Sequence, residues 1–285
     1  MQKHSLSFEA IGTLWLIETD TPLSTRLTQK IFKRIESFDK TYSRFRSDSL
    51  VSQIAKKEGI YTFPNDAVEL FAFYKKIYDV TNGKVTPLIG GVLEKAGYDA
   101  TYSFVETAQT KLPLWDEALQ WNGNIVKVHM PVTLDVGAAG KGYLVDLVCG
   151  LLDVEGITNY IIDAGGDVRH KGALENKVGL EDPYDPSRVI GAIDVKDKSI
   201  CASAINRRAW GDGVHHIFDP DFMKPTKEII ATWVIADTAM IADGLATALF
   251  FVDPNVLRKQ FNFEFLRMRH NGAIDYSTAF EGRLF

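Results

Sequence analysis

The segment Leu134–Asp146, LDVGAAGKGYLVD, places a glycine-rich turn between two apolar stretches. The apolar run at 132–136 predicts a strand, and the leucines and valines that follow Tyr143 at helical spacing predict a helix. Glycines let backbone amides approach a ligand and a helix N-terminus favours anions, so together with Lys141 the turn predicts a seat for phosphate. A tight turn with a solvated lysine explains these residues about as well, since the spacing matches neither a Walker A loop nor the Rossmann fingerprint.

The composition of the whole chain excludes several classes of protein. A chain of 285 residues, 46% of them hydrophobic, can bury a sizeable core in one large domain or two closely packed halves. The net charge is −5 and the basic residues are scattered, so we expect no nucleic-acid surface. The two cysteines, Cys149 and Cys201, form neither a disulfide framework nor a zinc motif, which fits a reducing compartment.

The N-terminal twenty residues contain no uninterrupted apolar core of a signal peptide and no lipobox-like cysteine. No stretch elsewhere approaches the ~20 apolar residues that a membrane-spanning helix needs. If the sequence is the complete gene product, we expect a cytoplasmic protein without stable membrane insertion. A removed export signal would leave no trace in it.

Strand and helix signals do not alternate regularly along the chain, and it contains no internal repeat or linker. This order favours an α+β fold over a doubly wound one. The expected elements are a strand at 8–18, a helix capped by Thr21 or Ser24 and running to about Asp39, a short helix capped by Ser47 or Asp48, a strand at 159–168 ending in a glycine turn, a helix at 238–252 closed by Asp253-Pro254, and a hairpin turn at 270–272.

The predicted helix at 238–252 is apolar except for one carboxylate, Asp243. An unpaired buried carboxylate is costly, so Asp243 should accept hydrogen bonds or bind a cation. Thr247 follows one helical turn later on the same face, and Mg²⁺ prefers such hard oxygen ligands. Hydrogen bonding of Asp243 to nearby backbone is the alternative, which the spacing alone slightly favours.

Two adjacent histidines, His215 and His216, precede an apolar segment. A histidine beside a nucleotide site can act as a general base, although a structural role is more common. Because neighbouring side chains on a strand face opposite sides, at most one of the two is expected to be catalytic. Asp163, which precedes Gly165-Gly166, is expected to form the turn rather than contact a ligand.

Taken together, these segments resemble the ApbE family, the FAD:protein FMN transferases. The resemblance covers residues from about 11 to 252 and rests on several motifs in the family's order rather than on any one of them. The motifs are IGT (11–13), where the family usually has MGT, YSRFRSDSLVSQI (42–54), TNGKVTPLIGGVL (81–93), LDVGAAGKGYLVD (134–146), IIDAGGDVRHKG (161–172), CASAINRR (201–208), HHIFDP (215–220) and IADGLATALFFV (241–252).

This resemblance implies a single ApbE-like domain over residues 1–285, with mixed or antiparallel sheets flanked by helices. It implies that Mg²⁺ is held by the backbone carbonyl of Gly140 and the side chains of Asp243 and Thr247. His216 matches the histidine proposed to activate the acceptor hydroxyl. The predicted FAD contacts are Ile11, Phe45, Lys84, Val85, Thr86, Gly137 and Tyr143, together with Lys141 and His216.

The sequence departs from the family pattern at several positions. Thr86 stands where the family commonly has Asp, and Val85 where it has Phe. Gly140 replaces Ala, and Ala204 replaces the glycine of the TSG element. After Asp219-Pro220 the usual TG is replaced by DFMKP, residues 221–225. These departures concern flavin contacts and turnover, and they leave the predicted metal ligands in place.

The implied reaction is Mg²⁺-dependent transfer of FMN from FAD to a threonine or serine hydroxyl of an acceptor protein, with release of AMP. The acceptor should present that hydroxyl on an accessible segment. Two alternatives remain: a metal-dependent FAD pyrophosphatase, in which water replaces the hydroxyl, and an FAD-binding protein without transfer activity.

Overall fold

The computed structural model describes residues 3–107, 111–207, 209–210, 214–280 and 282–285. It divides into two compact units, each built from separate stretches of the chain. Unit 1 comprises Met1–Ile35, Ala139–Arg207 and Lys227–Phe285, and unit 2 comprises Glu36–Ala138 and Arg208–Thr226. The single domain over 1–285 stays a prediction.

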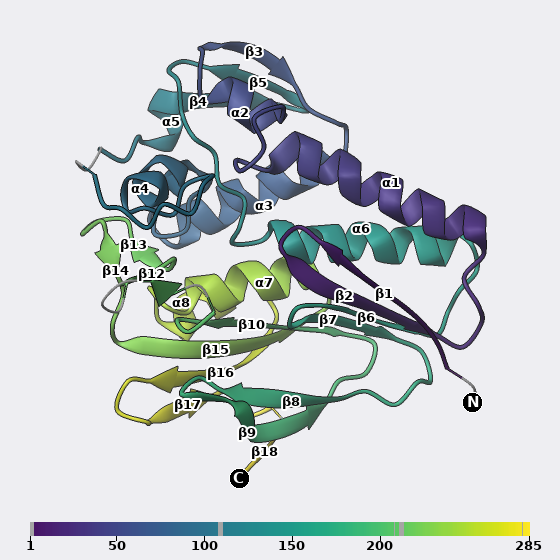
Figure 1. Ribbon diagram of the computed structural model, residues 1–285. Coiled ribbons are helices and arrows are strands. Elements are labelled where there is room, and N and C mark those ends of the chain that lie inside the picture. Colours follow the sequence, from purple (N-terminus) through teal and green to yellow (C-terminus); the bar gives the residue numbers. More distant parts are fainter. Residues whose placement is uncertain (1–2, 108–110, 208, 211–213, 281) are drawn as a thin grey trace. The chain divides into compact units, whose positions relative to one another are not determined.

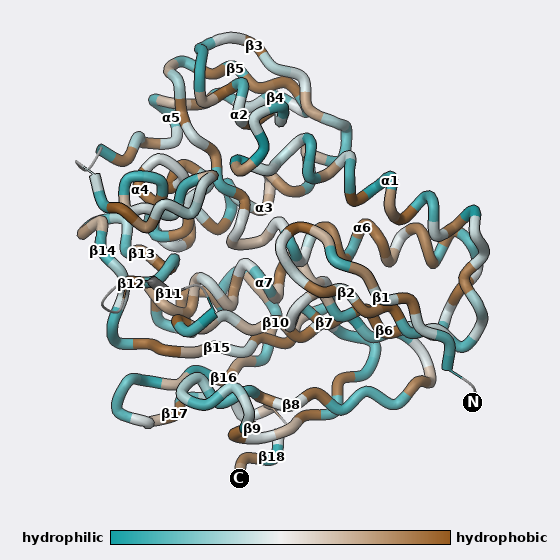
Figure 2. Tube along the Cα trace, in the orientation of Figure 1, coloured by the Kyte–Doolittle hydropathy of each residue, from teal (hydrophilic) through white to brown (hydrophobic). Residues whose placement is uncertain are grey.

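An eight-stranded antiparallel sheet forms the centre of unit 1 (Figure 1). All eight residues of its inner strand β15, Ile229–Ala236, are buried (Figure 2). Because both faces of this strand are covered, its sequence does not alternate between apolar and polar residues. In the order of the sheet, the strands are β1 (His4–Ala10), β2 (Thr13–Thr19), β6 (Tyr160–Ala164), β7 (Asp167–Lys171), β10 (Ser199–Ala204), β15, β16 (Glu264–Arg269) and β17 (Ile274–Tyr276).

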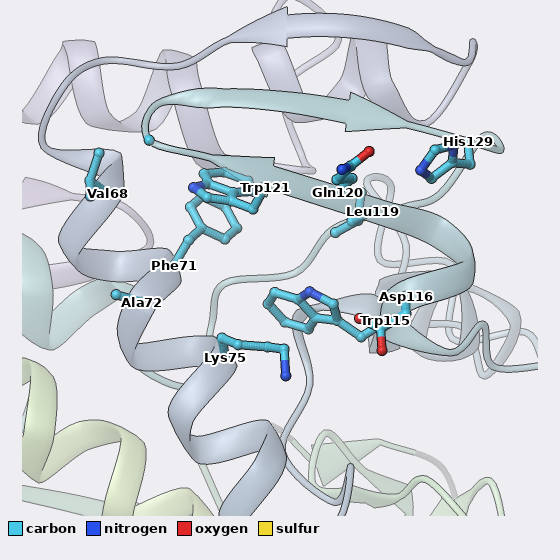
Figure 3. Close-up of a pocket in the computed structure, with 11 residues that line it drawn as sticks. Val68, Phe71, Ala72, Lys75, Trp115, Asp116, Leu119, Gln120, Trp121 and His129 are labelled. Atoms are coloured by element: carbon cyan, nitrogen blue, oxygen red, sulfur yellow. The ribbon is translucent and has the colours of Figure 1, made fainter.

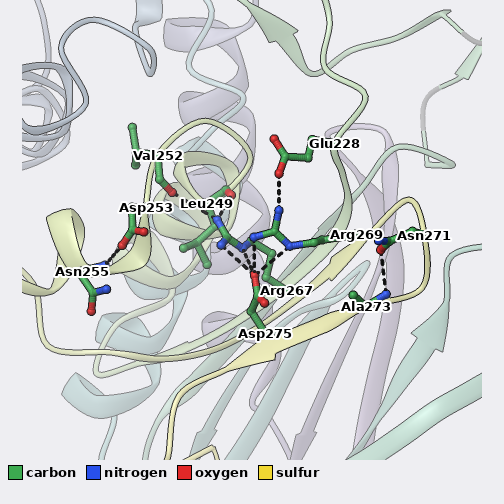
Figure 4. A network of polar contacts seen from close by, with 10 residues as sticks. All are labelled: Glu228, Leu249, Val252, Asp253, Asn255, Arg267, Arg269, Asn271, Ala273 and Asp275. Atoms are coloured by element: carbon green, nitrogen blue, oxygen red, sulfur yellow. Dashed lines mark hydrogen bonds and ion pairs between the residues drawn. The ribbon is translucent and has the colours of Figure 1, made fainter.

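Two helices of unit 1, α6 (Gly140–Val154) and α7 (Ala239–Ala248), contact each other and β7, and α7 also contacts β10. The end of α7 is anchored to the sheet by Arg267 of β16, which donates to the carbonyl oxygens of Leu249 and Val252 at 3.4 and 3.5 Å (Figure 4). A cation suits the negative end of a helix. Arg267 is itself held by Asp275 of β17 at 2.9 Å, so α7 has a fixed position in unit 1.

The rest of unit 1 consists of a small sheet, a short helix and most of a long helix. The first stretch of unit 1 ends at Ile35, so one boundary with unit 2 falls inside the long helix α1. The elements are α1 (Thr25–Tyr42), α8 (Pro254–Arg258), and the sheet of β18 (Arg283–Leu284), β9 (Asp185–Asp194) and β8 (Lys177–Asp182).

Unit 2 combines short helices with a three-stranded sheet around an aromatic core. The rings of Phe71 and Trp121 stack there with their centroids 3.7 Å apart. The elements are α2 (Leu50–Ile54), α3 (Ala67–Val80), the 3₁₀ helix η1 (Pro87–Ile89), α4 (Gly90–Lys95), α5 (Trp115–Ala118), the sheet of β3 (Gly59–Thr62), β5 (Ile125–Val128) and β4 (Leu119–Asn122), and the strand pairs β11 (Ala209–Trp210) with β12 (Val214–His215) and β13 (Phe218–Asp219) with β14 (Lys224–Pro225).

The predicted α+β class is confirmed. Ser24 begins α1 as expected, because its hydroxyl accepts a hydrogen bond from the Leu27 amide at 3.2 Å. The strand predicted at 159–168 is β6, and it turns at Gly165-Gly166 into β7. The hairpin predicted at 270–272 joins β16 to β17. No helix in the described part of the chain is long and apolar enough to cross a membrane.

Several predicted boundaries are wrong. Residues 132–136 form no strand, and the chain reaches α6 as irregular backbone. The segment 8–18 is a hairpin rather than one strand, because Ile11 and Gly12 adopt left-handed φ values of 44° and 75°. Ser49, not Ser47 or Asp48, caps α2. Asp253 does not close the helix at 238–252; α7 ends at Ala248, and Asp253-Pro254 begins α8 with the Asp253 side chain as its cap.

Candidate functional site

Two tight turns of unit 1 lie side by side at one end of the large sheet. The first is the β1–β2 turn at Ile11-Gly12, and the second is Gly165-Gly166 between β6 and β7. A side chain at Gly165 would place its Cβ 1.9 Å from Oγ1 of Thr13, so only glycine allows this approach. Asp163 forms the second turn as expected, accepting from the Gly166 amide at 2.9 Å.

The helices α6 and α7 each provide a carboxylate for the N-terminus of the other. Oδ2 of Asp243 in α7 accepts from the Gly142 amide in the first turn of α6 at 3.0 Å. In return, the Asp146 carboxylate of α6 accepts from the amides of Ala239 and Met240 at the start of α7, at 2.9 and 2.8 Å. A carboxylate satisfies unpaired amides and suits the positive end of a helix, so the two N-termini hold each other.

Gly140 and Gly142 are helical, although the sequence predicted a turn here, and the arrangement explains the glycine at 142. A Cβ at Gly142 would lie 2.2 Å from the Ala239 carbonyl oxygen and 2.8 Å from Cβ of Asp243. The absence of a side chain therefore lets α6 and α7 approach closely enough for their caps to form. This packing outweighs the poor helix propensity of glycine.

We expect Gly142→Ala to destabilise the protein by roughly 1–3 kcal/mol or more, because the new methyl group would collide with the backbone of α7. Gly150→Ala in the same helix is the matched control, since a Cβ there meets nothing within 4 Å. That variant should be stabilised by about 0.5–1 kcal/mol. Urea unfolding of both variants measures the difference, and equal midpoints would rule out the close contact.

Lys141 lies in the same turn of α6 and is held by unit 1. Its Nζ is 2.5 Å from Oδ2 of Asp167 and donates to the Ala164 carbonyl at 2.9 Å. Burial alone would lower the pKa of Lys141, but the negative charge of Asp167 raises it above its usual value, so the lysine stays charged. Burial raises the pKa of the neighbouring Cys201 thiol well above its usual value, which keeps this group protonated and unreactive.

The three predicted metal ligands all belong to unit 1. Asp243 and Thr247 lie one turn apart on α7, and Gly140 begins α6, whose Gly142 amide donates to Asp243 at 3.0 Å. In the described residues, no group of three or more His, Cys, Asp or Glu side chains could hold a metal ion. The predicted set instead offers a carboxylate, a hydroxyl and a carbonyl, a donor set suited to a hard cation that keeps some of its waters.

Two predicted flavin contacts of unit 2, Phe45 and Gly137, are linked through charged neighbours. The buried guanidinium of Arg44 lies 4.2 Å from the centroid of the Phe45 ring, and its Nε donates to Oδ2 of Asp135 at 2.6 Å. Oδ1 of Asp135 accepts from the Gly137 amide at 2.6 Å. A single ion pair therefore fixes both segments within this unit.

Lys84 of unit 2 is bound by the DFMKP segment that departs from the family pattern. Its Nζ lies 2.6 Å from Asp219 and 2.6 Å from Asp221, and 5.5 Å from the centroid of the Phe222 ring. Burial alone would lower the pKa of Lys84, but these two carboxylates raise it above its usual value. Asp219 precedes the DFMKP segment, so this segment adds a second carboxylate, Asp221, to the contacts of Lys84.

The other departures near Lys84 have local structural roles. Oγ1 of Thr86 accepts from the Leu88 amide at 3.2 Å and caps η1. Aspartate, the residue common in the family, caps helices equally well. Val85 is buried in the core, and its amide donates to Oγ1 of Thr81 at 3.1 Å. Tyr143 in unit 1 is also buried, with 2% of its surface exposed.

The two adjacent histidines have different surroundings. His215 is buried; its Nδ1 accepts from the Ile217 amide at 3.3 Å, and its Nε2 lies 2.8 Å from the Thr226 carbonyl, so Nε2 carries the proton. Burial lowers the pKa of His215, which keeps the ring neutral and structural. The expectation that both lie on a strand is wrong, because β12 ends at His215 and His216 is half-buried in a bend.

A hollow of about 550 Å³ in unit 2 contains none of the predicted site residues (Figure 3). It lies between α3 and β4, with the rings of Phe71, Trp115 and Trp121 on its walls and Lys75 and His129 at its rim. The site predicted from the sequence is therefore distinct from this hollow.

Sequence reasoning missed several residues that support the site. Asp146 carries the same signal as Asp243, a carboxylate inside an apolar helix, and could have been found in this way. The pairing of Lys141 with Asp167, of Phe45 with Arg44, and of Lys84 with Asp221 left no such signal. The first and the third of these pairs join separate elements of the fold, whereas Arg44 and Phe45 are neighbours in one turn.

Comparison with known proteins agrees with this picture. A profile of the ApbE family matches residues 11–265. The FAD:protein FMN transferase of Klebsiella pneumoniae (strain 342) is 24% identical, over 98% of this chain and 85% of its own length. The ApbE protein of Thermotoga maritima superposes with a TM-score of 0.84 at 23% identity, and the flavin transferase ApbE of Vibrio cholerae with 0.81 at 21%, each match covering 98% of both chains.

These structural likenesses confirm the predicted ApbE-like fold. The profile match also covers all the motifs on which the sequence resemblance rests, from the IGT turn through α7. On this evidence the chain belongs to the ApbE family.

Proposed function

We propose that this chain transfers FMN from FAD to a threonine or serine hydroxyl of an acceptor protein, in a Mg²⁺-dependent reaction that releases AMP. The observation that carries the proposal is the junction of α6 and α7 in unit 1, where a glycine-containing helix N-terminus, a charged lysine and a buried carboxylate lie together. The name of the Klebsiella relative, FAD:protein FMN transferase, supports the same activity.

The residues of the junction fit a magnesium ion. In this proposal Asp243, Thr247 and the carbonyl of Gly140 hold it. When bound, Mg²⁺ would neutralise charge on the pyrophosphate of FAD and on the departing AMP. The negative charges of the buried carboxylates Asp167 and Asp243 both raise the pKa of Lys141. Lys141 itself pairs with Asp167, which leaves the Asp243 carboxylate as the charged member of the proposed metal set.

Lys141 and the first turn of α6 would bind the pyrophosphate. The pairing with Asp167 keeps Lys141 protonated and restricts its orientation, so little entropy is lost when phosphate binds. Preorganised charge of this kind stabilises the transition state of phosphoryl transfer without reorganisation. We propose that Ile11, Phe45, Lys84, Val85, Thr86, Gly137 and Tyr143 contribute the remaining flavin contacts.

His216 is the proposed general base. A neutral imidazole would accept the proton of the acceptor hydroxyl as its oxygen forms a bond to the FMN phosphorus, and the phosphorus–oxygen bond to AMP breaks with its electron pair leaving on AMP. The acceptor hydroxyl must approach the phosphorus to about 3–3.5 Å, so we expect it on a flexible, accessible segment.

The decisive experiment incubates the purified protein with FAD, Mg²⁺ and an acceptor protein that carries an accessible threonine segment. We expect flavin fluorescence on the acceptor band of a denaturing gel and a mass increase equal to FMN less water. Free FMN and AMP with every acceptor offered would identify a pyrophosphatase instead. Intact bound FAD would identify a binding protein without transfer activity.

We expect Lys141→Ala to weaken FAD binding at least about tenfold more than riboflavin binding, because riboflavin has no phosphate for the lysine to contact. Isothermal titration of both ligands measures this difference. Lys198→Ala is the control, since Lys198 also pairs with an aspartate, Asp237, but at 3.5 Å on the surface. An equal loss of both ligands in Lys141→Ala would indicate damaged folding and contradict a phosphate contact.

A further inference from the structure

Strand β1 forms one edge of the eight-stranded sheet of unit 1. Within the described residues it pairs only with β2, and this pairing runs from His4 to Ala10 without a register shift. The opposite edge strand, β17, has only three residues. Proteins usually protect a sheet edge with a very short strand, a bulge, a proline or a lysine. None of these features occurs in the seven residues of β1, HSLSFEA, so this long and regular edge can pair with a further strand.

The β1–β2 turn determines which backbone groups of β1 face the free edge. The two turn residues have left-handed φ values of 44° and 75°, as in a type I′ turn, and the flanking residues Ala10 and Thr13 lie opposite each other. Residues that flank such a turn exchange both backbone hydrogen bonds, and pairs of this kind alternate with non-bonded pairs along an antiparallel ladder. The amide and carbonyl groups of Ser5, Ser7 and Glu9 therefore point away from β2.

The apolar layer on the inner face of β1 is only partly covered. Leu6 of β1 lies opposite Ile17 of β2, and Phe8 lies opposite Trp15. The two β2 residues have no exposed surface, whereas Leu6 and Phe8 are only partly buried. Phe32 of α1 packs edge-on against Phe8 with the ring centroids 5.0 Å apart, and 42% of its surface is exposed. Apolar surface thus extends to the free edge, where an added strand would bury more of it.

The sequence of β1 is complementary to itself in the antiparallel direction. When two copies are centred on Ser7, all seven residues overlap and the outward backbone groups of both strands meet. Ser5 then lies opposite Glu9 of the second copy, where its hydroxyl can donate to the carboxylate. Leu6 lies opposite Phe8 of the second copy in a pair without backbone hydrogen bonds, in which side chains approach most closely. Centring on Glu9 would instead place two carboxylates opposite each other.

We propose that two copies of this chain associate by pairing β1 with β1 about a twofold axis at Ser7, which joins their large sheets into one. The pairing forms about six backbone hydrogen bonds, two for each pair of outward-facing residues. Both copies contribute the same surface, so the contact closes as a dimer and does not extend into a filament. Because the paired strands are antiparallel, the two β1–β2 turns of the candidate sites lie at opposite ends of the interface.

Sedimentation equilibrium of the whole chain over a range of protein concentrations tests this proposal. We expect a reversible dimer with twice the 31.8 kDa mass of one chain. Ser7→Pro removes an outward amide, which an edge strand can lack without breaking its pairing with β2. This variant should raise the dissociation constant of the dimer by about tenfold or more, because each copy loses a hydrogen-bond donor. Ser7→Ala is the matched control, since it keeps the amide and should keep the dimer.

Charge substitutions at the two ends of β1 test the register. Ser5→Lys places a cation opposite Glu9 of the second copy and should tighten the dimer by about twofold or more. Adding Glu9→Lys to this variant places two lysines opposite each other and should weaken the dimer below the wild type. Glu9→Lys alone places a lysine opposite Ser5, and its affinity should lie between those two. These variants contain no proline, so they test the proposal even if Ser7→Pro does not fold.

Three results would overturn the inference. The first is a wild type that stays monomeric at the highest concentrations reached. The second is a dimer that Ser7→Pro and the charges at positions 5 and 9 leave unchanged, since its interface would lie elsewhere. The third is a monomeric wild type in which Ser7→Pro abolishes transfer to the acceptor but not FAD binding, which would identify a strand of the acceptor as the occupant of this edge. The mass measurement does not depend on FMN transfer, so a monomer would leave the proposed function untouched.

Discussion

Asp243→Ala is expected to abolish Mg²⁺-dependent turnover. The substitution removes the only carboxylate of the proposed metal set, and a hard divalent cation binds weakly to the remaining carbonyl and hydroxyl. It also removes the acceptor for the Gly142 amide, so some loss of stability should accompany the loss of activity. The measurement is FMN transfer as a function of Mg²⁺ concentration, together with riboflavin binding to show that the flavin ring site survives.

Asp243→Asn separates the two roles of this side chain. Asparagine keeps the volume and can accept from Gly142 through its amide oxygen, but it lacks the charge that binds the metal. Asp146→Asn is the matched control, because Asp146 provides the reciprocal cap for α7 and is not a proposed ligand. It should lower stability by about 0.5–2 kcal/mol and keep the wild-type Mg²⁺ dependence. Normal Mg²⁺ dependence in Asp243→Asn would refute the metal proposal.

His216→Ala is expected to retain FAD and to lose transfer by roughly 10²–10⁴-fold, the usual contribution of general base catalysis. The wild-type rate should fall in acid, because only the neutral imidazole accepts a proton, and the variant should lose this pH dependence. Single-turnover transfer across a range of pH values measures both effects. A full rate in His216→Ala would exclude this histidine as the base.

His215→Gln is the comparison for this experiment. His215 joins Ile217 and Thr226 by hydrogen bonds, and burial lowers its pKa, so its ring contributes to stability in the neutral form. That contribution is present above the unfolded-state pKa of about 6.5 and is lost as the pH falls through the lower folded-state pKa. His215→Gln should therefore change acid stability and preserve the pH dependence of the rate that is assigned to His216.

Much of the local structure followed from short-range patterns in the sequence. The start of α1 at Ser24, the β6–β7 turn and the hairpin before β17 were predicted because capping, glycine turns and alternation depend on neighbouring residues. The α+β class and the family resemblance followed from the order of such segments. Asp243 was recognised because a carboxylate in an apolar helix needs a partner. The sequence alone did not identify that partner.

The tertiary structure decided the partners and the boundaries that depend on them. The run at 132–136 has the composition of a strand but forms none, and Gly142 is helical and lies against α7, where a side chain would collide with the Ala239 carbonyl. Lys141 pairs with Asp167, and Lys84 pairs with Asp221 of the DFMKP segment, only after distant parts of the chain have come together. Periodicity and propensity describe interactions within a few residues, whereas packing and ion pairing are set by residues far apart in the sequence, so these features required the folded chain.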